Sequence, residues 1–273
     1  TAYEITYGDW SSDVCSSDLT VTVAKADATV VVTPYSVTYD GGAHTATVAS
    51  ITGVHGETGA TVGTVDVSGT THTNAATYAD SWTFTGTGNY NDIAATPITD
   101  VISQADATVT VSNYSGTYDG ASHTASVTIT GVGGDGTLAS HSVSRTNAGS
   151  DSTTASIAGL QNYHDASGTA TVTIAKADAI VVVTPYSVTY DGGAHTATIA
   201  SITGVDGESG VTVGTVDVSS TTHTNAATYA DSWTFTGTNN YNNIAATPIT
   251  DVISQADATV TARDRKSTRL NSS

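Results

Sequence analysis

A phrase of 13 residues that occurs twice without change constrains this chain more than any other feature. The sequence YSVTYDGGAHTAT at Tyr35–Thr47 returns at Tyr186–Thr198, and the variant YSGTYDGASHTAS lies between them at Tyr114–Ser126. Identical copies 151 residues apart indicate a tandem array in which one folding unit is used several times. The sequence therefore predicts several copies of one small fold rather than one large domain.

Three repeats cover most of the chain. Repeat A spans 25–103, repeat B spans 104–175 and repeat C spans 176–254. Repeats A and C align without gaps and differ at eight of 79 positions, whereas repeat B is seven residues shorter and more divergent. The least conservative difference between A and C places His55 where C has Asp206.

The two ends of the chain do not follow the repeat pattern. Residues 1–19 and 263–273 resemble the conceptual translation of a sequencing adapter, and we expect them to be foreign to the protein. Inside these segments, residues 20–24 match the end of a B repeat and residues 255–262 match the start of another. We therefore expect the natural sequence to come from a longer array in which B repeats alternate with repeats of the A and C type.

The charge of the repeats excludes several classes of partner. Residues 20–262 contain three basic side chains, Lys25, Arg145 and Lys176, against twenty acidic ones, a net charge of about −17. Such a surface repels nucleic acid and anionic lipid, and no apolar run is long enough to cross a bilayer. The only cysteine of the sequence, Cys15, lies in the adapter-like segment. We therefore expect no nucleic-acid partner, no membrane contact and no thiol chemistry in the repeats.

Strand-forming residues dominate each repeat. Thr, Val, Ile and Tyr are separated by breaks rich in Gly and Asn, and no segment keeps the apolar period of a helix. The strands expected in repeat A are Ala28–Tyr35, His44–Ile51, Thr61–Ser68, Tyr78–Thr85 and Ala94–Ser103. Short strands at this spacing predict an all-β chain, a tandem array of small immunoglobulin-like β-sandwich domains. A β-grasp-like unit is the alternative fold.

The repeated phrase itself is expected to form a β-hairpin. Pro34 ends one strand because it cannot donate to a ladder, and Asp40–Gly42 supplies the residues of a turn with positive φ. Further along, Trp82 and Phe84 alternate with polar residues and are predicted to face the core, as is Trp233 in repeat C. Repeat B contains no Trp or Phe, so we expect it to be the least stable repeat.

Four motifs occur in the same order along the repeats. They are the TYDG turn, TNAGS at Thr146–Ser150 with TNAAT at Thr73–Thr77 and Thr224–Thr228, NY as at Asn162–Tyr163, and the closing TVTIAKADA. In this combination the chain resembles the MBG/YDG repeats, which occur in tandem in large adhesin-like surface and secreted proteins of bacteria. The resemblance covers all three repeats. It implies an extracellular location at the bacterial cell surface, and it implies no catalytic residues.

An aspartate recurs at every boundary between repeats and is the best candidate metal ligand. Asp27, Asp106, Asp178 and Asp257 each stand in an ADA tripeptide where one repeat passes into the next. Calcium prefers carboxylate oxygens, so these four residues are the calcium candidates, and solvated linker charges are the ordinary interpretation. No other cofactor is expected.

The remaining candidates for chemistry are weaker. Asp40 and His44 form a pair that recurs in each repeat, but a closed zinc site needs three or four ligands. The loops GGDG at Gly133–Gly136 and DGES at Asp206–Ser209 resemble calcium loops without the alternating acidic ligands of an EF-hand. No G-x-S-x-G nucleophile motif occurs, so the chain is not expected to be an enzyme. The equivalent Asp–His pairs are Asp119 with His123 and Asp191 with His195.

The expected function is mechanical and adhesive. The repeats predict a non-catalytic stalk or adhesive region of a bacterial cell-surface or secreted protein, a monomeric rod that also adds weak multivalent contacts. Its partner would be a host or environmental surface ligand or polysaccharide, bound through the parent protein. In the alternative, each repeat is a carbohydrate- or ligand-binding module. That alternative needs an exposed aromatic platform, so the burial of Trp82 and Trp233 is the feature that separates the two.

Overall fold

The structure is a computed structural model that describes residues 22–263. Of the adapter-like stretches, residues 1–19 and 264–273 lie outside the described residues, so the expectation that they are foreign to the protein stays a prediction. The described part contains 18 β-strands and four short 3₁₀ turns but no α-helix, which confirms the all-β prediction. None of its helical segments is long and apolar enough to cross a membrane.

The described chain divides into two compact units. The first consists of residues 22–106 together with the short segments Val132–Asp135 and Gly159–His164. The second consists of Ala107–Gly131, Gly136–Ala158 and residues 165–263. Repeat A therefore lies in the first unit with two loops of repeat B, and the strands of repeat B lie in the second unit with repeat C.

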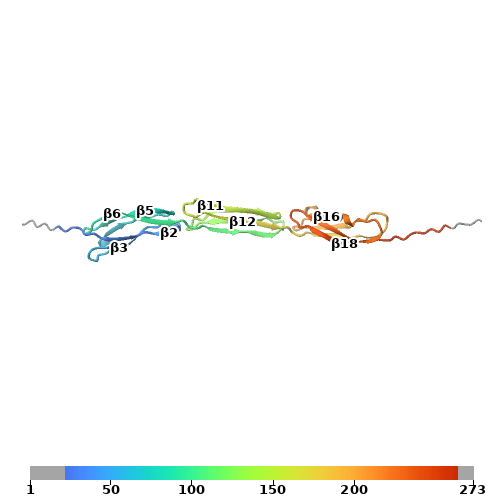
Figure 1. Ribbon diagram of the computed structural model, residues 1–273, viewed down its shortest axis with the longest axis horizontal. Helices are drawn as coiled ribbons and strands as arrows, with labels where there is room; N and C mark the ends of the chain where they lie inside the picture. Colours follow the sequence, from blue (N-terminus) through green and yellow to red (C-terminus); the bar gives the residue numbers. More distant parts are fainter. Residues whose placement is uncertain (1–21, 264–273) are drawn as a thin grey trace, which may run out of the picture. The chain divides into compact units, whose positions relative to one another are not determined.

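Repeat A forms two sheets (Figure 1). Its strands are β1 (Thr29–Thr33), β2 (Ser36–Thr38), β3 (Thr47–Thr52), β4 (Gly63–Asp66), β5 (Ala76–Gly86) and β6 (Ile93–Ser103). The smaller sheet pairs β1 with β3, and the larger has the order β2–β6–β5–β4. All pairs are antiparallel except β2 with β6.

Both sheets of repeat A bury side chains in one core. Trp82 and Phe84 of β5 are only 7% and 1% exposed, because successive residues of a strand face opposite sides and these two share the inner one. Val62 and Tyr90 complete the buried cluster, and Val30 of the smaller sheet packs against it. Trp233 is 8% exposed in repeat C, so the predicted burial of both tryptophans is confirmed.

The first strand of repeat A is divided between the two sheets. Pro34 and Tyr35 interrupt it, and β1 before them pairs with β3 whereas β2 after them pairs with β6. The freed N–H of Tyr35 donates to Oδ1 of Asp100 at 2.9 Å, a carboxylate that is fully buried. The Asp40–Gly42 turn therefore joins strands of different sheets, and the predicted hairpin is wrong.

Two of the expected strands are shorter than predicted. The strand expected at Thr61–Ser68 is reduced to β4, because 3₁₀ turns at Gly59–Thr61 and Ser68–Thr70 flank it. The strand expected from His44 begins only at Thr47, because His44 forms an isolated bridge instead of joining the ladder. The imidazole of His44 lies within hydrogen-bonding distance of Asp40 in the turn.

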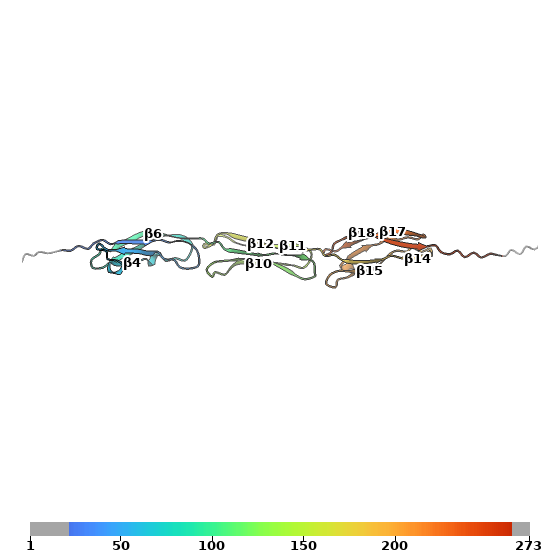
Figure 2. The ribbon, with the colours of Figure 1, turned by 90° about the horizontal axis from the view of Figure 1, so that it is seen from below.

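The second unit also contains two sheets in each repeat (Figure 2). Repeat C has the strand pairing of repeat A, whereas in repeat B the fourth strand moves to the other sheet, which gives the orders β10–β9–β7 and β11–β12–β8. The strands of repeat B are β7 (Thr108–Ser112), β8 (Tyr114–Thr117), β9 (His123–Thr130), β10 (Thr137–Arg145), β11 (Gly149–Ile157) and β12 (Ala166–Ala175). Those of repeat C are β13 (Ile180–Thr184), β14 (Ser187–Thr189), β15 (Thr198–Thr203), β16 (Gly214–Asp217), β17 (Ala227–Gly237) and β18 (Ile244–Ser254). In each, the second strand pairs in parallel with the last, β8 with β12 and β14 with β18.

Candidate functional site

Two of the four predicted calcium ligands at the repeat boundaries accept hydrogen bonds from side-chain amides. Oδ1 of Asp27 accepts a hydrogen bond from Nδ2 of Asn91 at 2.8 Å, and Oδ1 of Asp178 accepts one from Nδ2 of Asn242 at 2.7 Å. Asp106 and Asp257 are exposed. Across residues 22–263, no three His, Cys, Asp or Glu side chains come together in a group that could hold a metal. Calcium binding at these aspartates stays a prediction.

The Asp–His pairs of the repeated phrase close a turn. Nε2 of His44 lies 3.0 Å from Oδ1 of Asp40, and the same oxygen accepts the backbone N–H of Gly42 at 2.8 Å. The bond from Gly42 and then the bond from His44 lower the pKa of Asp40 below its ordinary value. The turn thus satisfies the carboxylate locally, and repeats B and C contain the same pair.

The tyrosine of the TYDG motif lies at a junction between repeats. In the first unit, the hydroxyl of Tyr39 donates to Oδ2 of Asp135 at 2.9 Å, in the loop of repeat B. Tyr163 of repeat B donates to the same oxygen at 2.5 Å. The two rings meet edge to face, with centroids 5.6 Å apart at 78°, a favourable arrangement for aromatic pairs. One carboxylate therefore binds two tyrosines from two repeats.

The asparagine of the NY motif binds the TNA motif at the same junction. The backbone N–H of Ala75 donates to Oδ1 of Asn162 at 2.8 Å, and Nδ2 of Asn162 donates to Oδ1 of Asn74 at 3.1 Å. Gln161 adds a bond from Nε2 to the carbonyl of Ala75 at 3.4 Å. Because the amide of Asn162 uses its acceptor and its donor on neighbouring residues, its position is set from both ends.

The chain itself is fixed where it passes from repeat A into repeat B. The N–H of Ala105 donates to the carbonyl of Asn162 at 2.9 Å, and the N–H of His164 donates to the carbonyl of Ala105 at 3.0 Å. Ala105 is 2% exposed. Nε2 of Gln104 donates to the carbonyl of Leu160 at 2.9 Å. Ala105 therefore forms an isolated β-bridge with Tyr163, between the end of β6 and the start of β7.

Two glycines bring the backbones of the repeats close together. Gly41 has a φ of +82°, a conformation that other residues rarely adopt. A Cβ placed on Gly41 would lie 3.1 Å from Cα of Gly133. The glycine of the TYDG motif is thus needed for its backbone angle and also for this contact.

The second unit contains the same junction between repeats B and C. The hydroxyl of Tyr118 donates to Oε1 of Glu208 at 2.9 Å, and its ring meets Tyr241 edge to face at 5.7 Å and 81°. Tyr241 also donates to the Glu208 carboxylate. Oδ1 of Asn240 accepts the N–H of Ala148 at 2.9 Å, and its Nδ2 donates to Oδ1 of Asn147 at 3.1 Å.

Burial and the shared carboxylates raise the pKa values of these tyrosines. Burial, followed by the bond to Glu208, raises the pKa of Tyr241 from 10.0 to about 12. The same causes raise the pKa of Tyr118, and burial followed by the bond to Asp135 raises that of Tyr163. Each phenol therefore stays neutral and acts as a hydrogen-bond donor over the physiological range.

The motifs that form this interface are visible in the sequence, but the contacts between them are not. TYDG, TNA and NY recur visibly in the sequence, but the turn chemistry of TYDG predicts a hairpin and not a contact between repeats. Asp135 and Glu208 stand in the loops that resemble calcium loops. The signal that could have found them is an acidic residue at the same place in each loop: Glu57 in repeat A, Asp135 in repeat B and Glu208 in repeat C. The residue two positions earlier is His55, Gly133 and Asp206, respectively.

Comparison with models of known protein families gives no match, and comparison with curated proteins gives none either. The resemblance to MBG/YDG repeats therefore rests on the four motifs, and the interpretation of the interface rests on its geometry.

Proposed function

We propose that this chain is a non-catalytic stalk or adhesive repeat region of a bacterial cell-surface or secreted protein, built from MBG/YDG-like domains with an immunoglobulin-like fold. The observation that carries the proposal is that one interface occurs twice, once in each unit. Each copy uses the same three motifs, and a repeat needs those motifs at both of its ends only if it is joined to neighbours at both ends.

The fold supports the immunoglobulin-like assignment over the β-grasp alternative. Repeat A has two sheets around one core, and its first strand is shared between them. A β-grasp unit packs a helix on its sheet, and residues 22–263 contain no α-helix. Sheets that enclose a common core are the arrangement of a β-sandwich.

The interface suits a mechanical function. A carboxylate bound by two tyrosines and an asparagine amide bound at both ends are directional contacts, and charge-assisted hydrogen bonds are the stronger kind. They lie beside a hydrogen-bonded connection, so bending at the junction would break several contacts together. The proposed location outside the cell agrees with the acidic, cysteine-free repeats.

The carbohydrate-binding alternative loses its main support. Stacking on a sugar needs an exposed aromatic ring, and Trp82 and Trp233 are 7% and 8% exposed. Both lie in cores, where they contribute to stability.

Force spectroscopy of the chain held by tags at its two ends tests the proposal. A stalk of three folded repeats, each with its own core, should give three unfolding events, each releasing about 75 residues, roughly 250 Å of extended chain. One gradual extension without separate events would count against a mechanical role. Binding of the chain to immobilised polysaccharides with Trp82 still buried would favour the binding-module alternative.

A further inference from the structure

Repeat C carries a third copy of the surface that receives a neighbouring repeat. Tyr190, Asn225 and Ala226 occupy the positions of Tyr39, Asn74 and Ala75 in the gapless alignment of A with C. Tyr190 is 43% exposed, whereas Tyr39 is 7% exposed. The surface is thus built like the first junction but is left open.

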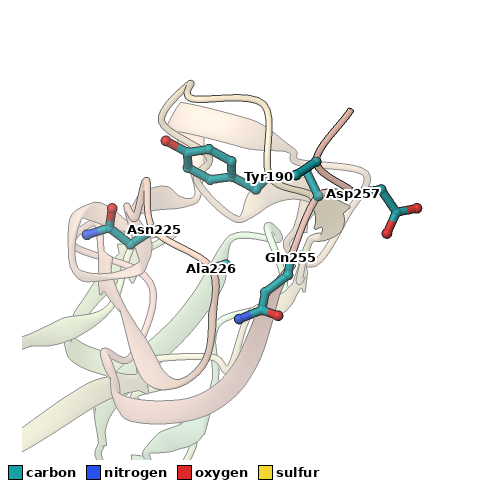
Figure 3. A pocket seen from close by; sticks show the side chains of 7 residues that line it. Tyr190, Asn225, Ala226, Gln255 and Asp257 are labelled. Atoms are coloured by element: carbon teal, nitrogen blue, oxygen red, sulfur yellow. The ribbon is translucent and has the colours of Figure 1, made fainter. Parts of the chain in front are cut away.

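The open surface has the form of a shallow pocket of about 510 Å³ (Figure 3). Tyr190, Asn225 and Ala226 line it together with the segment 255–258. The carboxylate of Asp257 points away from Tyr190 and Asn225. The phenol of Tyr190 and the amide of Asn225 therefore line the pocket, and the carboxylate of Asp257 does not lie between them. Their equivalents Tyr39 and Asn74 bind repeat B at the first junction.

We propose that this surface is a docking site for a further repeat of the B type, which presents a carboxylate, an Asn-Tyr pair and a glycine at the tip of its loop. This inference rests on the proposed function, because it treats the chain as part of an array. In the docked state, Tyr190 donates to the carboxylate of the incoming loop, and the incoming asparagine binds Asn225 and Ala226.

The connecting residue selects the B type. Gln104 leads into repeat B and binds the carbonyl of Leu160, whereas Lys176 leads into repeat C and binds the carbonyl of Tyr241 through Nζ at 3.1 Å. After Ser254 the chain continues with glutamine, and Gln255–Thr261 repeats Gln104–Thr110 without change. The segment that follows repeat C is therefore suited to the B-type partner.

The close contact between backbones has no occupant in repeat C. Gly192 has a φ of +82°, like Gly41, but a Cβ placed on it would meet nothing within 4 Å. Gly41 fits against Gly133, which has no side chain. A loop of the C type has Asp206 at this place, and its side chain is received by Gly120 of repeat B. The non-conservative exchange of His55 for Asp206 thus falls at the point where repeats touch.

The test replaces residues 255–273 of the chain with a copy of residues 104–175 and measures tyrosine oxidation by hydroxyl radicals with mass spectrometry. Peptides of repeats A and C differ at Thr29 and Ile180, so the two equivalent tyrosines are measured separately. In the original chain Tyr190 should react several-fold faster than Tyr39. In the extended chain its rate should fall to that of Tyr39.

A matched variant carries the equivalent of N162A in the appended repeat only. The side chain of Asn162 binds across the junction, to Asn74 and Ala75, so the appended repeat should still fold and the rate of Tyr190 should rise again. If Tyr190 reacts as fast in the extended chain as in the original chain although the appended repeat is folded, the proposal is overturned. Protection of Tyr190 in the original chain with rising concentration would assign the surface to a second copy of this chain and would also overturn it. Neither result would alter the three unfolding events that test the stalk.

Discussion

The hydroxyl of Tyr39 binds Oδ2 of Asp135, 96 residues further along the chain, at 2.9 Å. The contact joins the turn of one repeat to a loop of the next. Its counterpart, Tyr118 with Glu208, spans 90 residues. The repeated phrase therefore does two things: it connects the sheets within a repeat, and it presents the tyrosine that binds the following repeat.

Tyr39→Phe should lower the denaturant midpoint of the chain. The substitution keeps the ring packed on Tyr163 and removes only the donor to Asp135, which then loses one of its two tyrosine partners. Tyr190→Phe is the matched control, because the equivalent ring is 43% exposed and should leave the midpoint unchanged. Urea unfolding measures the midpoint of each variant. Equal midpoints for the two substitutions would mean that the hydrogen bond at the junction adds nothing to stability.

Trp82→Ala and Trp233→Ala should each destabilise their own repeat by about 3–5 kcal/mol, because each removes a large buried side chain and leaves a cavity. The two repeats are nearly identical, so the two effects should agree. Urea unfolding followed by circular dichroism measures both. Strong quenching of the wild-type tryptophan fluorescence by a soluble quencher would show that the rings are exposed and would contradict the core assignment.

The stability of the chain should fall at high pH. The pKa of Tyr241 is about 12 in the folded protein and 10.0 ordinarily, so the folded state favours the neutral phenol. Its contribution to stability is complete below pH 10 and is lost as the pH rises from about 10 to about 12. Titration of tyrosinate absorbance should show a late step that disappears in Tyr241→Phe. Ionisation of all tyrosines together near pH 10 in the folded chain would contradict this.

Repeat B should exchange its amide hydrogens fastest. Its core is made of Ala, Val, Ile and Tyr side chains, such as Val127, Ile129 and Val172, and it has no counterpart of Trp82 or Phe84. Smaller buried side chains bury less apolar area and stabilise less. Hydrogen exchange with mass spectrometry should show β9 to β12 opening before β5, β6, β17 and β18. Slower exchange in repeat B than in A and C would show that its junctions outweigh its smaller core.

Local patterns in the sequence predicted the core better than the connections. Trp82 and Phe84 could be assigned to the core because a strand alternates with a period of two, a property of neighbouring residues. The division of the first strand could not be predicted, because it depends on Asp100, which binds Tyr35 from 65 residues away. The junction was missed for the same reason. The motifs recur visibly in the sequence, but nothing local shows that Asp135 meets Tyr39.

Small-angle scattering of the segment Thr20–Ala262 tests most directly the central proposal, that the chain is a stalk of repeats joined end to end. Strands of eight to ten residues make each repeat very roughly 30–40 Å long. Three repeats in line would reach on the order of 100 Å, with a radius of gyration of about 30 Å. The account predicts this value for the wild type and a broader distribution of distances for the double variant Tyr39→Phe, Asn162→Ala. A radius of gyration near that of a single globule of this size, about 18 Å, would contradict it.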